Sequence, residues 1–178
     1  MEERTEIRLS GSGGQGLILA GIVLAEAAIL DGKNAVQSQS YGPEARGGAS
    51  RAEVVISDGD IDYPKVTRPK VLLALTEQAF NRFKDSVADD GIIILDSSIE
   101  KDDTPREIIQ LPIIETAKNE IGKGMVANMV ALGVIVELTK VVTKQAAEKA
   151  ISNRVPKGTE DLNLKAFHAG CNLAEKRV

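Results

Sequence analysis

The chain has 178 residues, of which 43% are hydrophobic and 27% charged, and its formal net charge is −4. This length suits a single domain with a sizeable core. The acidic balance, an aromatic content of 3% and the lack of tryptophan argue against a nucleic-acid-binding protein, which needs cations for phosphates and rings for bases.

The chain contains one cysteine, Cys171, and one histidine, His168. A single thiol cannot hold an iron–sulfur cluster, a cysteine-based zinc site or an internal disulfide, so we expect no metal site here. Residues 1–5 are acidic and do not form a signal peptide. The longest apolar run, 125–138, is too short and too interrupted to cross a bilayer. These features predict a protein of the reducing cytoplasm without a membrane partner.

The first elements form a strand, a glycine-rich turn and a helix. The apolar alternation at residues 6–9 predicts the strand, and the aliphatic run 17–30 predicts the helix, which Gly32 ends. The turn between them is Gly11-Ser12-Gly13-Gly14-Gln15-Gly16. Such turns bring backbone N–H groups close to phosphates at a helix N-terminus, and we expect a positive φ at Gly13 or Gly14. By itself the motif is weak, because a tight turn that serves only packing also needs glycines.

Two nucleotide-binding signatures remain incomplete in this sequence. A dinucleotide-binding domain needs an acid after its second strand, which we predict at residues 34–40, but Asp31 lies before that strand. A Walker A loop needs Lys followed by Ser or Thr where this chain has Leu17 and Ile18. A free-standing nucleotide-binding enzyme is therefore the weaker alternative.

The second glycine-rich segment is the loop Ser40-Tyr41-Gly42-Pro43-Glu44-Ala45-Arg46-Gly47-Gly48. Its arginine suits two-pronged recognition of a phosphate or a carboxylate. The alternative is a surface loop in which Glu44 and Arg46 pair with each other. Loops at the carboxyl ends of strands form the ligand crevice of open α/β sheets, which favours a binding role.

The rest of the chain alternates strands and helices. We predict strands at 49–57, 71–75, 92–96 and 108–114, and helices at 77–83, 115–120, 125–140, 144–152 and from 159 onward. In the third strand Arg51 and Glu53 share one face. The continuous apolar runs are typical of a parallel sheet covered on both faces. The pattern predicts an α/β fold: one Rossmann-like domain over residues 1–178, with a largely parallel sheet covered by helices and a helical C-terminal part.

Several single residues receive structural interpretations. We interpret Asn128 as a satisfied buried amide, and Thr143 and Thr159 as helix caps. The last helix should bury a stripe formed by Leu162, Ala166, Ala169 and Leu173. His168 and Cys171 on that helix are interpreted as packing or surface residues without a catalytic role.

The two glycine-rich segments together resemble the gamma subunit of the 2-oxoacid:ferredoxin (acceptor) oxidoreductases. The resemblance covers the full length and includes Asn128 with Ala131-Leu132-Gly133, and Val155-Pro156. The loop, Tyr41-Gly42-Pro43-Glu44 followed by Arg46-Gly47-Gly48, is similar to that of the 2-oxoglutarate and branched-chain 2-oxoacid members. Ala45 stands where methionine is common in the family.

The resemblance implies a subunit of an enzyme that decarboxylates a 2-oxoacid, here 2-oxoglutarate, and transfers the acyl group to coenzyme A. Thiamine diphosphate and Mg²⁺ would belong to alpha and beta subunits, and iron–sulfur clusters to a delta ferredoxin-like subunit that passes electrons to ferredoxin. This chain would have no catalytic residue and be inactive in isolation.

Its residues near coenzyme A would be Gly11, Ser12, Gly13, Gly14, Gln15, Gly16, Tyr41, Gly42, Pro43, Glu44, Arg46, Gly47 and Gly48. The alternatives are a 2-oxoisovalerate or pyruvate member of the family, a nucleotide-binding protein, and an interaction module whose glycines serve only packing.

Overall fold

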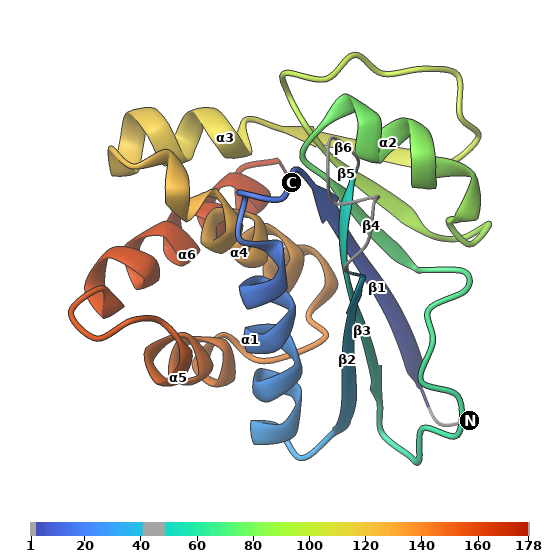
Figure 1. Cartoon of the computed structure of the whole chain (residues 1–178), viewed down its shortest axis with the longest axis horizontal. Coiled ribbons are helices and arrows are strands. Elements are labelled where there is room, and N and C mark those ends of the chain that lie inside the picture. Colours follow the sequence, from blue (N-terminus) through green and yellow to red (C-terminus); the bar gives the residue numbers. More distant parts are fainter. Residues whose placement is uncertain (1–2, 41–48, 178) are drawn as a thin grey trace.

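A six-stranded sheet runs through the computed structural model, which describes residues 3–40 and 49–177. The spatial order is β2-β3-β1-β4-β5-β6 (Figure 1). The strands are β1 (Arg4–Gly11), β2 (Asn34–Ser40), β3 (Ser50–Ser57), β4 (Val71–Ala74), β5 (Ile92–Asp96) and β6 (Glu107–Leu111). β1, β4, β5 and β6 pair in parallel, as the apolar runs predict. β3 is antiparallel to both of its neighbours, β2 and β1.

Helices cover both faces of the sheet (Figure 1). One face carries α1 (Leu17–Leu30), α4 (Ala127–Thr139), α5 (Lys144–Arg154) and α6 (Glu160–Glu175), and the other carries α2 (Glu77–Phe83). Short helical turns complete the chain: η2 (Lys84–Ser86), α3 (Ile113–Glu115), η3 (Thr116–Ile121) and η4 (Gly124–Val126). No helix in the described part of the chain is both long and apolar enough to cross a membrane. The α/β fold predicted from the sequence is confirmed.

The alternation of side chains along the strands creates two cores. Ile7, Leu73 and Ile94 point toward α1 and α4 and belong to the larger core. Leu72 and Leu95 point the other way and pack against α2 in a smaller core. This division confirms that the central strands are buried on both faces, which explains their continuous apolar sequence.

Helices α4 and α6 approach each other closely at two glycines. A Cβ atom added to Gly133 would overlap the carbonyl oxygen of Phe167, and one added to Gly170 would overlap that of Val130. The buried side of α6 therefore centres on Phe167 and Gly170. The stripe predicted from the sequence was partly wrong, because its members Leu162 and Leu173 are only partly buried.

One strand boundary and one helix cap differ from the sequence prediction. β6 ends at Leu111, because Pro112 has no N–H for the sheet and stands at the start of α3 instead. Thr143 caps α5 as predicted, accepting a hydrogen bond from the Ala146 N–H at 3.1 Å. Thr159 makes no such cap, because its hydroxyl donates to the carbonyl oxygen of Pro156 at 2.6 Å.

Candidate functional site

The glycine turn and the second glycine-rich segment follow strands that end on the same side of the sheet. Gly11, the last residue of β1, lies opposite Ser50, and Ser40, the last residue of β2, lies opposite Arg51. The Ser50 hydroxyl donates to the carbonyl oxygen of Gly11 at 3.1 Å and also lies 3.3 Å from that of Ser12. The structure therefore places the turn beside the residues that flank the segment 41–48.

The predicted site residues of that segment fall outside the described residues. They are Tyr41, Gly42, Pro43, Glu44, Arg46, Gly47 and Gly48. Their role stays a prediction from the sequence.

The conformation of the turn depends on Gly16 and Gln15. Gly16 is the N-cap of α1 and has a left-handed backbone, with φ +71° and ψ +24°. Gly14 has no positive φ, so the expectation that it would need one was wrong, and a Cβ there would meet no atom within 4 Å. The side chain of Gln15 folds over Gly11, and its Oε1 accepts a hydrogen bond from the Ser12 N–H at 2.8 Å.

The turn offers backbone donors to an anion. Residues 12–14 are exposed, the first turn of α1 contains no acidic residue, and no side chain caps that helix. An uncapped helix N-terminus leaves N–H groups unpaired and carries a partial positive charge, both of which favour a phosphate. Two N–H groups of the turn are already bonded: that of Ser12 donates to the Gln15 side chain, and that of Gln15 donates to the carbonyl oxygen of Ser12 at 3.2 Å.

Asn128 connects the turn to helix α4. Its side chain is 5% exposed, and its Nδ2 donates to the carbonyl oxygen of Gly16 at 3.1 Å. Its Oδ1 accepts from the Met129 N–H at 2.9 Å. The interpretation as a satisfied buried amide is confirmed. The sequence signal for its role was an amide at the start of an otherwise apolar helix.

Arg8 is a buried charged residue that the sequence analysis did not single out. Its guanidinium is buried on the face of the sheet opposite α1, where it lies 4.9 Å from the ring centroid of Phe83. It donates to Glu53 at 3.0 Å and to the Ser86 hydroxyl at 2.7 Å. The Nε of Arg51 lies 3.2 Å from the same carboxylate, which confirms that Arg51 and Glu53 share a face. One carboxylate thus serves two arginines, of which Arg51 lies beside the turn, opposite Ser10.

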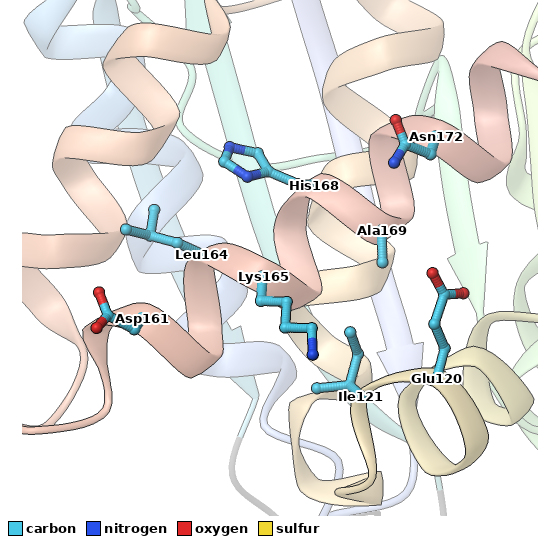
Figure 2. Close-up of a pocket in the computed structure, with 8 residues that line it drawn as sticks. All are labelled: Glu120, Ile121, Asp161, Leu164, Lys165, His168, Ala169 and Asn172. Carbon is cyan, nitrogen blue, oxygen red and sulfur yellow. The ribbon is translucent and has the colours of Figure 1, made fainter.

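A hollow of about 370 Å³ lies between η3 and α6, and several titratable side chains line it. Figure 2 shows Asp161 and Glu120 at different ends of this hollow, with Lys165 between them. His168 lines the hollow, and its Nε2 lies 2.8 Å from the Glu148 carboxylate of α5. These groups do not converge on one point, so the hollow does not have the geometry of an acid–base site.

Cys171 is also structural. It is 3% exposed, and burial raises the pKa of its thiol to about 11, so the thiol is protonated at neutral pH. Among the described residues, no three His, Cys, Asp or Glu side chains come close enough together to hold a metal ion.

Comparisons with known proteins agree on the relatives of this chain. The family model described as pyruvate ferredoxin/flavodoxin oxidoreductase matches residues 6–173. The 2-oxoglutarate synthase subunit KorC of Methanocaldococcus jannaschii is 49% identical over 178 residues, with 97% of this chain and 95% of that protein covered.

Two solved structures share the fold. The gamma subunit of a keto/oxoacid ferredoxin oxidoreductase from Geobacter sulfurreducens has a TM-score of 0.88 and 50% identity, with 97% of this chain and 99% of that chain covered. A 2-oxoglutarate:ferredoxin oxidoreductase from Magnetococcus marinus has a TM-score of 0.87 and 26% identity. The match covers 98% of this chain but 31% of that longer chain, whose structure is described with 2-oxoglutarate, coenzyme A and succinyl-CoA bound.

Proposed function

The chain belongs to the pyruvate ferredoxin/flavodoxin oxidoreductase family, and we propose that it is the gamma subunit of a 2-oxoglutarate:ferredoxin oxidoreductase complex. Its relatives that are about half identical over nearly the whole chain are named as a 2-oxoglutarate synthase subunit and as a gamma subunit. The enzyme works as a complex, and this chain is one of its subunits. Its contribution is to shape the entrance for coenzyme A.

The observation that carries this role is the glycine turn at the uncapped N-terminus of α1. Coenzyme A has phosphate groups, and the exposed residues 12–14 with the first N–H groups of α1 suit a phosphate. The Magnetococcus enzyme, part of which shares this fold, is described with coenzyme A bound. The sequence motif with Tyr41 and Arg46, which lies outside the described residues, is assigned to the same site in this proposal.

The residues of this chain do not fit the other cofactors of the reaction. An iron–sulfur cluster needs several thiolates, and the single thiol, Cys171, is buried. We therefore assign the clusters to a delta ferredoxin-like subunit that reduces ferredoxin. The family resemblance assigns thiamine diphosphate and Mg²⁺ to alpha and beta partner subunits. One unpaired cysteine suits a reducing compartment, so the proposal includes a cytoplasmic location.

Co-purification of the tagged native protein tests the proposal. The tagged chain should bring down its thiamine-binding and cluster-binding partners, and the complex should reduce a viologen dye with 2-oxoglutarate and coenzyme A. Pyruvate and 2-oxoisovalerate in the same panel test the alternative substrates. The pure chain should show no turnover, and clear turnover by the pure chain would contradict its role as a subunit.

Arg46 gives the proposed coenzyme A contact its own test. In the reconstituted complex, Arg46→Ala should raise the KM for coenzyme A, and Arg46→Lys should restore little if the contact is two-pronged. Arg177→Ala is the matched control, because it removes an exposed ion pair with Glu107 and should change nothing. Loss of co-purification would instead indicate a subunit contact. If Arg46→Ala changes neither assembly nor the KM for coenzyme A, the proposed contact is refuted, and a surface ion pair between Arg46 and Glu44 is the remaining interpretation.

A further inference from the structure

Asn128 joins the starts of two helices. Gly16 is the N-cap of α1, and its carbonyl oxygen accepts a hydrogen bond from the Ala20 N–H at 3.3 Å, as the first turn of that helix requires. The same oxygen also accepts from the Nδ2 of Asn128 at 3.1 Å. Asn128 is the second residue of α4, so one buried amide connects the start of α4 to the start of α1.

The two hydrogen bonds of Asn128 fix which way its amide faces. Its Oδ1 accepts from the Met129 N–H at 2.9 Å, so its Nδ2 faces Gly16. Turning the amide round would set its oxygen against the carbonyl oxygen of Gly16 and its NH2 group against the N–H of Met129. Because the residue is only 5% exposed, bulk water would not replace the lost partners. Position 128 therefore supplies one donor in one direction.

The direction of the Gly16 carbonyl sets the direction of the next N–H group. A peptide unit is planar and trans, so the C=O of Gly16 and the N–H of Leu17 point in opposite directions. Because the carbonyl points along α1, the Leu17 N–H points out of the helix start. Leu17 is the first residue of α1, so its N–H has no acceptor within the helix. Glycine has the most mobile backbone, and a partner for its carbonyl holds both groups in one orientation.

We propose that Asn128 is a positioning residue for a phosphate of coenzyme A at the glycine turn. By holding the Gly16 carbonyl it orients the Leu17 N–H before the ligand arrives, which lowers the cost of binding. A neutral donor suits this place, since a carboxylate would repel both the carbonyl oxygen and the phosphate. The first turns of α1 and α4 contain no acidic residue, so no charge opposes the partial positive charge of either helix start. This inference rests on the proposed function.

Steady-state kinetics of the reconstituted complex test the positioning role. Asn128→Ala should raise the KM for coenzyme A at least about fivefold and leave the kcat at saturating coenzyme A and the KM for 2-oxoglutarate unchanged. Asn163→Ala is the matched control. Asn163 is 7% exposed, and its Nδ2 donates to the carbonyl oxygen of Thr159, the N-cap of α6, at 2.9 Å. That helix begins with two acids, Glu160 and Asp161, so the control should keep the wild-type KM for coenzyme A.

A second variant covers the case in which Asn128→Ala fails to assemble. Asn128→Asp keeps the shape of the side chain and an acceptor for Met129 but loses the donor to Gly16, so it should also raise the KM for coenzyme A. If neither variant assembles while Asn163→Ala does, Asn128 serves only the fold, and the positioning role is refuted. A lower kcat with an unchanged KM for coenzyme A would refute it as well.

Ser12→Asp separates a failure of this inference from a failure of the proposed function. Ser12 is exposed in the turn, and a carboxylate there would repel a phosphate whatever Asn128 does. If Ser12→Asp raises the KM for coenzyme A and the Asn128 variants do not, the proposed site stands and the positioning role is refuted. If none of these variants changes that KM, coenzyme A does not bind at the turn, and both proposals for this site are overturned.

Discussion

Replacing Gly16 by alanine should destabilise the fold through two effects that the structure separates. Gly16 has φ +71°, a backbone conformation that an L-residue adopts only with strain. A Cβ there would also lie 2.6 Å from the Nδ2 of Asn128, closer than real contacts allow. Asn128 is buried, and its amide donates to the carbonyl oxygen of Gly16. The substitution therefore strains the backbone and displaces a buried hydrogen bond.

The size of the effect follows from these two terms. The left-handed conformation costs a non-glycine residue about 1–2 kcal/mol. Loss of the Asn128 hydrogen bond costs about 1–2 kcal/mol more, because a buried polar group loses its partner. The sum is roughly 2–4 kcal/mol, which for a domain of this size lowers the Tm by roughly 4–16 °C.

Thermal and urea unfolding of the purified chain measure the loss. Gly14→Ala is the matched control from the same turn, because its φ is not positive and its Cβ meets no atom within 4 Å. It should change stability by less than about 0.5 kcal/mol. The double variant Gly16→Ala with Asn128→Ala should lose less than the sum of the single losses, since both disrupt one contact. Equal stabilities for Gly14→Ala and Gly16→Ala would refute this reasoning.

Three further predictions concern buried residues. Gly133→Val should yield little folded protein in an expression and circular-dichroism test, because even a Cβ would overlap the carbonyl oxygen of Phe167. Asp96→Ala should cost roughly 2–4 kcal/mol in urea unfolding, since that buried carboxylate accepts hydrogen bonds from the Ser98 N–H and hydroxyl and from the Ile114 N–H. Native Cys171 should resist alkylation at neutral pH and react after denaturation. Because burial raises its pKa from 9.0 to about 11, its contribution to the unfolding free energy should be complete below pH 9.0 and decline as the pH rises through about 11.

The sequence by itself determined the local elements, since each follows from neighbours along the chain. The continuous apolar runs at 71–75 and 92–95 predicted the buried parallel strands β4 and β5. The alternation in β3 placed Arg51 and Glu53 on the face opposite its apolar residues. Gly32, with φ +80°, ended α1 as predicted. The family resemblance also came from local motifs. Pro112 could have predicted the end of β6 at Leu111, but the sequence prediction extended that strand to residue 114.

The tertiary structure alone decided which distant groups meet. The direction of β3, the contact of Asn128 with Gly16 and the burial of Arg8 between Glu53 and Ser86 each join segments that no local pattern connects. The same holds for Gly133. In the sequence it is one small residue in an apolar helix, and only the packing of α6 against α4 shows that a Cβ does not fit there. The physical reason is that periodicity reports which face of an element is buried, whereas partners across the core depend on how whole elements pack.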